Sequence, residues 1–188
     1  MPGFEIFGAE EKKEINEVLE TGVLFRYEFP DQRKGIYKVR EFEEKFAAYC
    51  GVKHGQAVTS GTAALKVALA ALGVGPGDEV ITQCFTFVAT WEAIFDVGAV
   101  PVFAEVDETL NLDPKELEKK ITAKTKVIIP VHMMGAAARI EEIKAIADKH
   151  GIPVLEDTAQ AAGASLNGRR LGSFGACGTF SFDPVKTM

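Results

Sequence analysis

Short apolar runs alternate with segments of helical periodicity along most of the chain. From about residue 56 onward, the apolar runs read QAVTS, DEVIT, VPVFAEV, KVIIPV, IPVLED and CGTFSF. The helical patterns between them include residues 62–72, 90–97 and 140–150. In the last of these, Ile140, Ile143 and Ala147 share one face. Strands that alternate with helices predict a mostly parallel sheet covered by helices, a three-layer α/β/α fold.

The first 40 residues follow a different pattern. A helical pattern at residues 10–19 leads into the long, irregular segment TGVLFRYEFPDQRKGIYKV, and a further helix is expected at residues 39–49. We therefore predict an N-terminal helix and arm over residues 1–40 and one large domain over residues 41–188. An arm of this length is unusual for a compact connection, and it favours contact with a second subunit.

Composition and charge limit the partners of the chain. Its 188 residues are 47% hydrophobic and 26% charged, as in globular proteins, and the net charge of −6 offers no basic surface for nucleic acid or anionic lipid. No apolar run approaches the roughly 20 residues that span a bilayer, and the first residues lack a signal-peptide pattern, so we expect a cytoplasmic protein. Cys50, Cys84 and Cys177 lie far apart without C-x-x-C spacing, and no metal site is expected.

The segment TSGTAALKVAL places the end of a predicted strand directly before a helix. The main-chain N–H groups of residues 60–63, Gly61 among them, then lie at a helix N-terminus, which favours an anion such as phosphate. An ordinary N-cap by Ser60 or Thr62 explains the same residues. The segment is not a P-loop, and the chain has no G-x-G-x-x-G motif, which argues against a nucleotide-binding oxidoreductase.

A carboxylate stands at the end of a strongly apolar strand in VLEDTAQAAGA. Asp157 is expected to be buried there, and a buried carboxylate is costly unless it meets a cation or several hydrogen-bond donors. A pyridinium N–H is one such partner, and Gln160, three residues further on, can reach the same ligand. The alternative is that Asp157 caps the following turn.

Aromatic and basic side chains follow two other predicted strands. Phe85 and Phe87 come after DEVIT and offer flat rings that can stack on a heterocycle, although alternate aromatics also suit a core. Lys186 comes after Ser181 and is either a solvated surface charge or, in apolar surroundings, an amine nucleophile. With the two segments above, these residues offer a phosphate cradle, a ring stacker, an acid for a pyridine nitrogen and an amine for an aldehyde.

These segments resemble the DegT/DnrJ/EryC1/StrS sugar aminotransferases, which use pyridoxal 5'-phosphate on the fold-type-I scaffold. The likeness runs over nearly the whole chain, through REFEEKFAAYCGVKHGQAVTSGTAAL, GPGDEVITQCFTFVATWEAI, PVHMMG, VLEDTAQAAGA and GSFGACGTFSFDPVK. It implies that the large domain binds this cofactor. It also implies a role for each candidate: Thr62 and Ala63 hold the phosphate with help from Ser181, Phe87 stacks on the ring, Asp157 and Gln160 bind the pyridine nitrogen and the ring hydroxyl, and Lys186 forms the Schiff base.

The resemblance further implies an aminotransferase that moves an amino group from an amino-acid donor, expected to be glutamate, to a keto sugar. The cofactor alternates between pyridoxal phosphate and pyridoxamine phosphate in such a reaction. Lysine rather than histidine at position 186 favours transamination over sugar dehydration. The sugar is expected to be nucleotide-linked or an octulosonate-type acid, in cell-surface polysaccharide or secondary-metabolite biosynthesis. A homodimer with shared active sites is implied, with no nucleic-acid or membrane partner.

Three residues are candidates for substrate contact. The segment GVLFRYEF is similar to an aromatic-basic-aromatic entrance in part of the family, which makes Arg26 and Tyr27 candidates. Arg26 can instead be a surface charge or form a salt bridge between subunits. His132 can line the site or be a structural histidine. Asp183 and residues 136–138 depart from the family's usual residues near the substrate, so they leave the identity of the sugar open.

The resemblance also implies further structure after Lys186. On the fold-type-I scaffold, an antiparallel strand that pairs with QAVTS and a small C-terminal domain follow the lysine, and both are expected to be absent here. We therefore expect the 188 residues alone to be inactive. The alternative function is a catalytically inactive module of the same fold that serves in binding or regulation.

Overall fold

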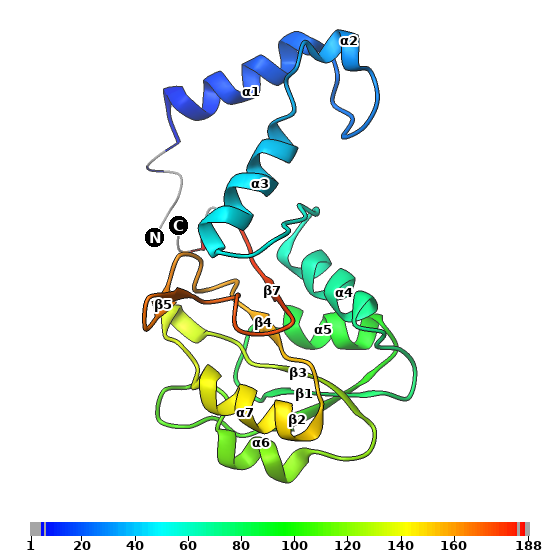
Figure 1. The fold of residues 1–188 in the computed structure, drawn as a ribbon, viewed down its shortest axis with the longest axis vertical. Coiled ribbons are helices and arrows are strands. Elements are labelled where there is room, and N and C mark those ends of the chain that lie inside the picture. Colours follow the sequence, from blue (N-terminus) through cyan, green and yellow to red (C-terminus); the bar gives the residue numbers. More distant parts are fainter. Residues whose placement is uncertain (1–4, 6, 184, 187–188) are drawn as a thin grey trace.

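The computed structural model describes residue 5, residues 7–183 and residues 185–186, and it shows a mixed α/β fold (Figure 1). The main strands are β1 (Glu79–Gln83), β2 (Val100–Ala104), β3 (Thr125–Ile129), β4 (Leu155–Asp157) and β7 (Cys177–Thr179). β2, β1 and β3 pair in that order and in parallel. β4 is bridged to β3 through Ile128–Val154 and Val131–Asp157, and it pairs in parallel with β7. The predicted parallel sheet is confirmed.

Helices cover both faces of this sheet, as Figure 1 shows. One face carries α4 (Gly61–Ala71) and α5 (Ala89–Asp96), and the other carries α6 (Pro114–Lys120) and α7 (Ile140–His150). Because successive strand residues point to opposite faces, Val127 and Ile129 join the core with α4 and α5, whereas Ile128 joins the core with α6 and α7. These two cores confirm the three-layer arrangement.

Residues 56–60, QAVTS, form no strand, which corrects the prediction. A strand needs a neighbouring backbone, and no described segment pairs with these residues. The segment is held by a side chain instead, since the N–H of Ala57 donates to Oε1 of Glu43 over 2.6 Å. Glu43 lies on α3 (Lys38–Cys50), a helix that the sequence predicted.

A small antiparallel hairpin, which was not predicted, precedes β7. Its strands β5 (Ser165–Leu166) and β6 (Arg169–Arg170) are joined by Asn167 and Gly168. Both linking residues have positive φ, as this type of two-residue turn requires. The guanidinium of Arg170 lies 4.3 Å from the ring centroid of Tyr49, so the hairpin also contacts α3.

The N-terminal segment stands apart from the sheet in Figure 1. It contains α1 (Ala9–Thr21), which has no buried residue, and α2 (Pro30–Arg33). The arm between them is more ordered than predicted, because the buried guanidinium of Arg33 donates to the carbonyl oxygens of Phe25, Tyr27 and Glu28. No helix in the described part of the chain is long and apolar enough to cross a membrane.

Candidate active site at the ends of the strands

The first turn of α4 lies against the segment that follows β7. The Oγ atom of Ser60 accepts a hydrogen bond from the N–H of Ala63 over 3.1 Å, so Ser60 is the N-cap. The N–H groups of Gly61 and Thr62 have no carbonyl partner within the helix, because they precede its first closed turn. An ideal Cβ atom on Gly61 would lie 3.0 Å from Cβ of Ser181. The serine cap is therefore compatible with an anion site formed by the remaining N–H groups and the Ser181 hydroxyl.

Asp157 ends β4 and is only 4% exposed. Its Oδ2 atom accepts from the hydroxyl of Thr90 over 2.9 Å, and its Oδ1 atom accepts from the N–H of Ala159 over 3.1 Å. Burial raises the pKa of Asp157 above its ordinary value, although both hydrogen bonds and the charge of Lys186 act in the opposite direction. The bond to Ala159 is the predicted turn contact, yet a carboxylate whose pKa is raised still favours a cationic partner.

Lys186 and Phe87 meet at the same edge of the sheet. The Nζ atom of Lys186 lies 4.9 Å from the centroid of the Phe87 ring, within the range of a cation–π contact. Phe87 precedes α5 and is 58% exposed, so its ring is not part of the core, and Lys186 is half-buried. Phe87 is therefore not a core aromatic, and Lys186 is not a freely solvated lysine. The structure therefore holds an amine over an accessible aromatic ring.

Two threonines that the sequence analysis did not identify link this region to Asp157. The hydroxyl of the buried Thr90 donates to Asp157, and it lies 3.1 Å from the hydroxyl of Thr86. The two residues stand four positions apart where the chain enters α5. Because Thr86 precedes α5 and Thr90 lies in its first turn, their nearness in the sequence was the only local signal for this contact.

Gln160 is hydrogen-bonded to the loop that follows β3, and His132 is part of that loop. The Oε1 atom of Gln160 accepts from the N–H of Met134 over 3.2 Å. His132 is fully buried: Nδ1 accepts from the N–H of Ala138 over 3.0 Å, and Nε2 lies 3.0 Å from Oε2 of Glu156. Because both ring nitrogens are engaged and no surface is exposed, His132 is a structural histidine. The structure corrects its assignment as a substrate contact.

Arg26 and Tyr27 belong to the segment between α1 and α2, and Figure 1 shows these two helices away from the sheet. The Nη2 atom of Arg26 is 2.6 Å from each carboxylate oxygen of Glu43, and the guanidinium lies 5.7 Å from the centroid of the Tyr27 ring. The hydrogen bond that Arg26 donates to Glu43 raises the pKa of Arg26. This ion pair forms within the chain, so it matches neither the free surface charge nor the subunit salt bridge that the sequence suggested.

The residues that the structure brings together fit pyridoxal 5'-phosphate. Main-chain donors at a helix N-terminus, with the Ser181 hydroxyl beside them, suit a phosphate, and the accessible ring of Phe87 suits a pyridine face. The buried carboxyl of Asp157 suits a protonated pyridine nitrogen, and the amine of Lys186 suits an aldehyde. Four parts of one cofactor thus have matching groups at one edge of the sheet.

Known proteins have sequences similar to that of this chain. The chain is 46% identical over 184 residues to the spore coat polysaccharide biosynthesis protein SpsC of Bacillus subtilis, and the match covers 97% of the chain and 45% of SpsC. It is 41% identical over 186 residues to the dTDP-3-amino-3,4,6-trideoxy-alpha-D-glucose transaminase of Streptomyces venezuelae, and that match covers 98% of the chain and 47% of the transaminase. The chain therefore spans about half the length of these curated relatives.

Solved structures share the fold. S. venezuelae DesV matches with a TM-score of 0.87 and 40% identity, over 97% of the chain and 47% of DesV. Spr1654 from Streptococcus pneumoniae, in its PLP form, matches with a TM-score of 0.82 and 32% identity, over 93% of the chain and 47% of Spr1654. The model of the DegT/DnrJ/EryC1/StrS aminotransferase family matches residues 6–188. The chain therefore belongs to this family, whose members use pyridoxal 5'-phosphate on the fold-type-I scaffold.

Proposed function

We propose that the protein is a cytoplasmic aminotransferase that depends on pyridoxal phosphate and acts on a keto sugar. The placement of Lys186 over Phe87, beside the buried Asp157, carries this proposal. The name of the Streptomyces relative supports a nucleotide-linked sugar, and that of SpsC supports polysaccharide biosynthesis. An octulosonate-type sugar acid is the second substrate class, and glutamate is the expected donor. Free thiols at all three cysteines suit the reducing cytoplasm.

Several residues bind and orient the cofactor in this proposal. The N–H groups of Gly61 and Thr62 and the hydroxyl of Ser181 bind the phosphate, where the helix dipole adds a favourable field. Phe87 supports one face of the ring, and Gln160, which follows β4 and accepts from the N–H of Met134, binds the ring hydroxyl. When bound, the cofactor supplies an electron sink for the amino carbon of the substrate.

Asp157 and Lys186 then hold and move protons. Ionised Asp157 keeps a proton on the pyridine nitrogen, and the resulting pair offsets the burial that raises the pKa of the carboxyl. Thr90 fixes the orientation of this carboxylate through its 2.9 Å hydrogen bond. When the cofactor is bound, Lys186 would be the amine that holds its aldehyde, and the same amine, once free, would hold and move the proton at the amino carbon of the substrate.

An aminotransfer assay tests this function. The chain spans about half the length of its relatives, so the assay uses purified protein of the relatives' full length. Incubated with pyridoxal phosphate, glutamate and a panel of nucleotide-linked keto sugars and keto sugar acids, it should form an amino sugar and an equal amount of 2-oxoglutarate, whereas residues 1–188 alone should not. Omission of the keto sugar should stop the sustained formation of 2-oxoglutarate, because the donor half-reaction alone ends after one turnover. A protein that binds the cofactor but aminates no member of the panel would instead favour the binding or regulatory module.

We also propose that two copies of the chain form a homodimer with shared active sites. Apolar side chains on the arm are exposed, with Leu24 at 75%, Phe25 at 70% and Tyr27 at 61%. Because the arm stands apart from the sheet of its own chain (Figure 1), it is available to bring Tyr27 to the site of a second copy, while Arg26 stays paired with Glu43 of its own chain. Sedimentation equilibrium should give a dimer for the native protein and a monomer for Leu24→Glu/Phe25→Glu. A monomeric native protein would contradict the proposal.

A further inference from the structure

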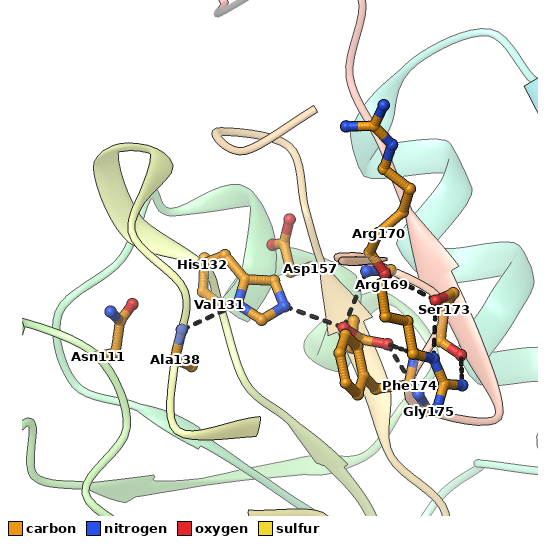
Figure 2. Close-up of polar contacts among 12 residues, drawn as sticks. Asn111, Val131, His132, Ala138, Asp157, Arg169, Arg170, Ser173, Phe174 and Gly175 are labelled. Atoms are coloured by element: carbon orange, nitrogen blue, oxygen red, sulfur yellow. Dashed lines mark hydrogen bonds and ion pairs between the residues drawn. The ribbon is translucent and has the colours of Figure 1, made fainter. Parts of the chain in front are cut away.

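A second buried carboxylate, that of Glu156, lies next to Asp157 on β4 and has a different set of partners. Glu156 has no exposed surface. Its Oε1 atom accepts from the N–H groups of Phe174 (2.6 Å) and Gly175 (2.7 Å), and its Oε2 atom accepts from the N–H of Gly172 (2.8 Å). Nε2 of His132 completes the set at 3.0 Å (Figure 2). A carboxylate has about four acceptor sites, so these partners saturate Glu156.

His132 connects this carboxylate to the loop after β3. Because Nδ1 of His132 accepts from the N–H of Ala138 over 3.0 Å, the ring proton lies on Nε2 and is donated to Glu156. Figure 2 shows the ring between Ala138 and the turn that carries Phe174 and Gly175. The His132–Glu156 pair therefore joins two loops that are far apart in the sequence.

The turn that Glu156 binds, residues 172–175, is pressed against the end of β7. A Cβ atom on Gly172, whose φ is +85°, would overlap the ring of Phe180, and a Cβ atom on Gly178 would overlap the backbone of Gly172. Phe180 immediately precedes Ser181, and Cβ of Ser181 lies 3.0 Å from the ideal Cβ position of Gly61. The position of the turn is thus transmitted through van der Waals contact to the first turn of α4.

We propose that Glu156 and His132 are a positioning pair that sets the phosphate side of the cofactor site, by holding the turn at residues 172–175 against Phe180 and thereby Ser181 against Gly61. The inference rests on the proposed function, because it concerns the cofactor of that function. Neither side chain contacts the phosphate cradle, although the main-chain N–H of His132 also donates to the carbonyl oxygen of Asp157 over 3.0 Å. They act through the turn, and the expected consequence of losing them is a displaced phosphate cradle.

The charge of Glu156 is essential to this arrangement. Burial raises its pKa, but the hydrogen bonds from His132 and from the N–H groups of Gly175 and Gly172 outweigh that effect and hold the pKa below its ordinary value. A glutamine has one oxygen and one NH₂ group at the same positions. Its NH₂ group would face either the N–H groups of the turn or the N–H of His132, and a buried donor would be left without an acceptor.

The test compares two ligands that differ only in the phosphate. In the purified Glu156→Gln protein, the dissociation constant of pyridoxal phosphate should rise by about tenfold or more, as expected for a disturbed set of buried hydrogen bonds. The dissociation constant of pyridoxal, which lacks the phosphate, should change by less than about twofold, because it does not use the displaced cradle. The exposed Glu141→Gln on α7 is the matched control and should leave both constants unchanged.

Variants of His132 keep the test decisive if Glu156→Gln does not fold. His132→Ala should weaken pyridoxal phosphate selectively, and His132→Gln, whose amide can still donate to Glu156, should recover part of that affinity. Equal weakening of both ligands, or a lower melting temperature with both constants unchanged, would show a merely structural role and overturn the proposal. Native protein that does not bind pyridoxal phosphate would overturn the proposed function itself, and the native titration identifies that case separately.

Discussion

A Lys186→Ala variant is expected to lose aminotransfer by at least roughly 10²–10⁴-fold, the range typical of a positioned general acid–base group. The structure holds the Lys186 amine 4.9 Å from the centroid of Phe87, and in the proposed function this amine bonds to the aldehyde and moves the proton of the amino carbon. The variant should also lose the bond to the cofactor that borohydride reduction makes permanent. Two measurements check this result: the rate of 2-oxoglutarate formation from glutamate, and the amount of cofactor that stays on the protein after reduction.

One further variant tests whether Lys186 acts as an amine nucleophile or only as a positive charge, and a second variant is the control. Lys186→Arg keeps a cation over Phe87, but the guanidinium stays protonated and cannot act as an amine nucleophile, so this variant should be as inactive as Lys186→Ala. Lys124→Ala removes an exposed lysine and should keep the native rate. Native turnover in Lys186→Ala, or full activity in Lys186→Arg, would exclude the proposed role of Lys186.

Amphipathic helices were the most predictable part of the fold. The pattern at residues 140–150 predicted α7 with the bounds that the structure shows, because Ile140, Ile143 and Ala147 are all fully buried on one side of the helix. Positive φ at Gly151 then ends the helix in the left-handed conformation that glycine adopts readily. Local sequence determines such an element, since its periodicity and its end signal lie within the element itself.

Strands were less predictable, because pairing depends on distant segments. The run at residues 56–60 has the composition of a strand, yet it has no neighbouring strand in the described structure and remains unpaired. The hairpin of β5 and β6 is the opposite case. Its Asn167–Gly168 turn is a strong local signal, but the flanking strands are two residues each, too short to show an alternating pattern.

In the candidate site, too, residues with a local sequence signal were predictable, and contacts between distant segments were not. Asp157 was identifiable because a carboxylate at the end of an apolar strand is conspicuous in the sequence. The contact with Thr90 was not, since the two residues are 67 positions apart and meet only after the sheet forms. His132 and Glu156 likewise look like ordinary polar residues in the sequence, and their roles depend on partners that other loops supply.

Asp157→Asn is expected to change stability and activity in opposite directions. In the cofactor-free protein, burial raises the pKa of Asp157 above its value in the unfolded chain, so ionisation costs stability. Asparagine fits the same space: its oxygen can accept from Ala159, and its NH₂ group can donate to the hydroxyl of Thr90, which can turn toward Thr86. The variant should therefore unfold at a higher urea concentration than the native protein at neutral pH.

The stability difference between Asp157→Asn and the native protein should depend on pH, in the sense set by the raised pKa of Asp157. Below the pKa of the unfolded carboxyl, both states of the native protein are protonated at Asp157, and the variant should have no advantage. The advantage should appear as the pH rises through the interval between the unfolded and folded pKa values, and it should stay constant above that interval. The exposed Asp148→Asn on α7 is the matched control and should show no such dependence.

Activity should fall in the same variant, because asparagine has no charge with which to keep the pyridine nitrogen protonated. We expect turnover to drop by roughly 10²–10³-fold, the effect typical of removing one electrostatic contact to charge that develops in a buried site. Urea unfolding of the cofactor-free protein across pH, together with the aminotransfer rate of the loaded protein, measures both effects. A variant that is less stable than the native protein at neutral pH would show that the carboxylate is already compensated without a ligand, and near-native turnover would show that it does not act on the ring nitrogen.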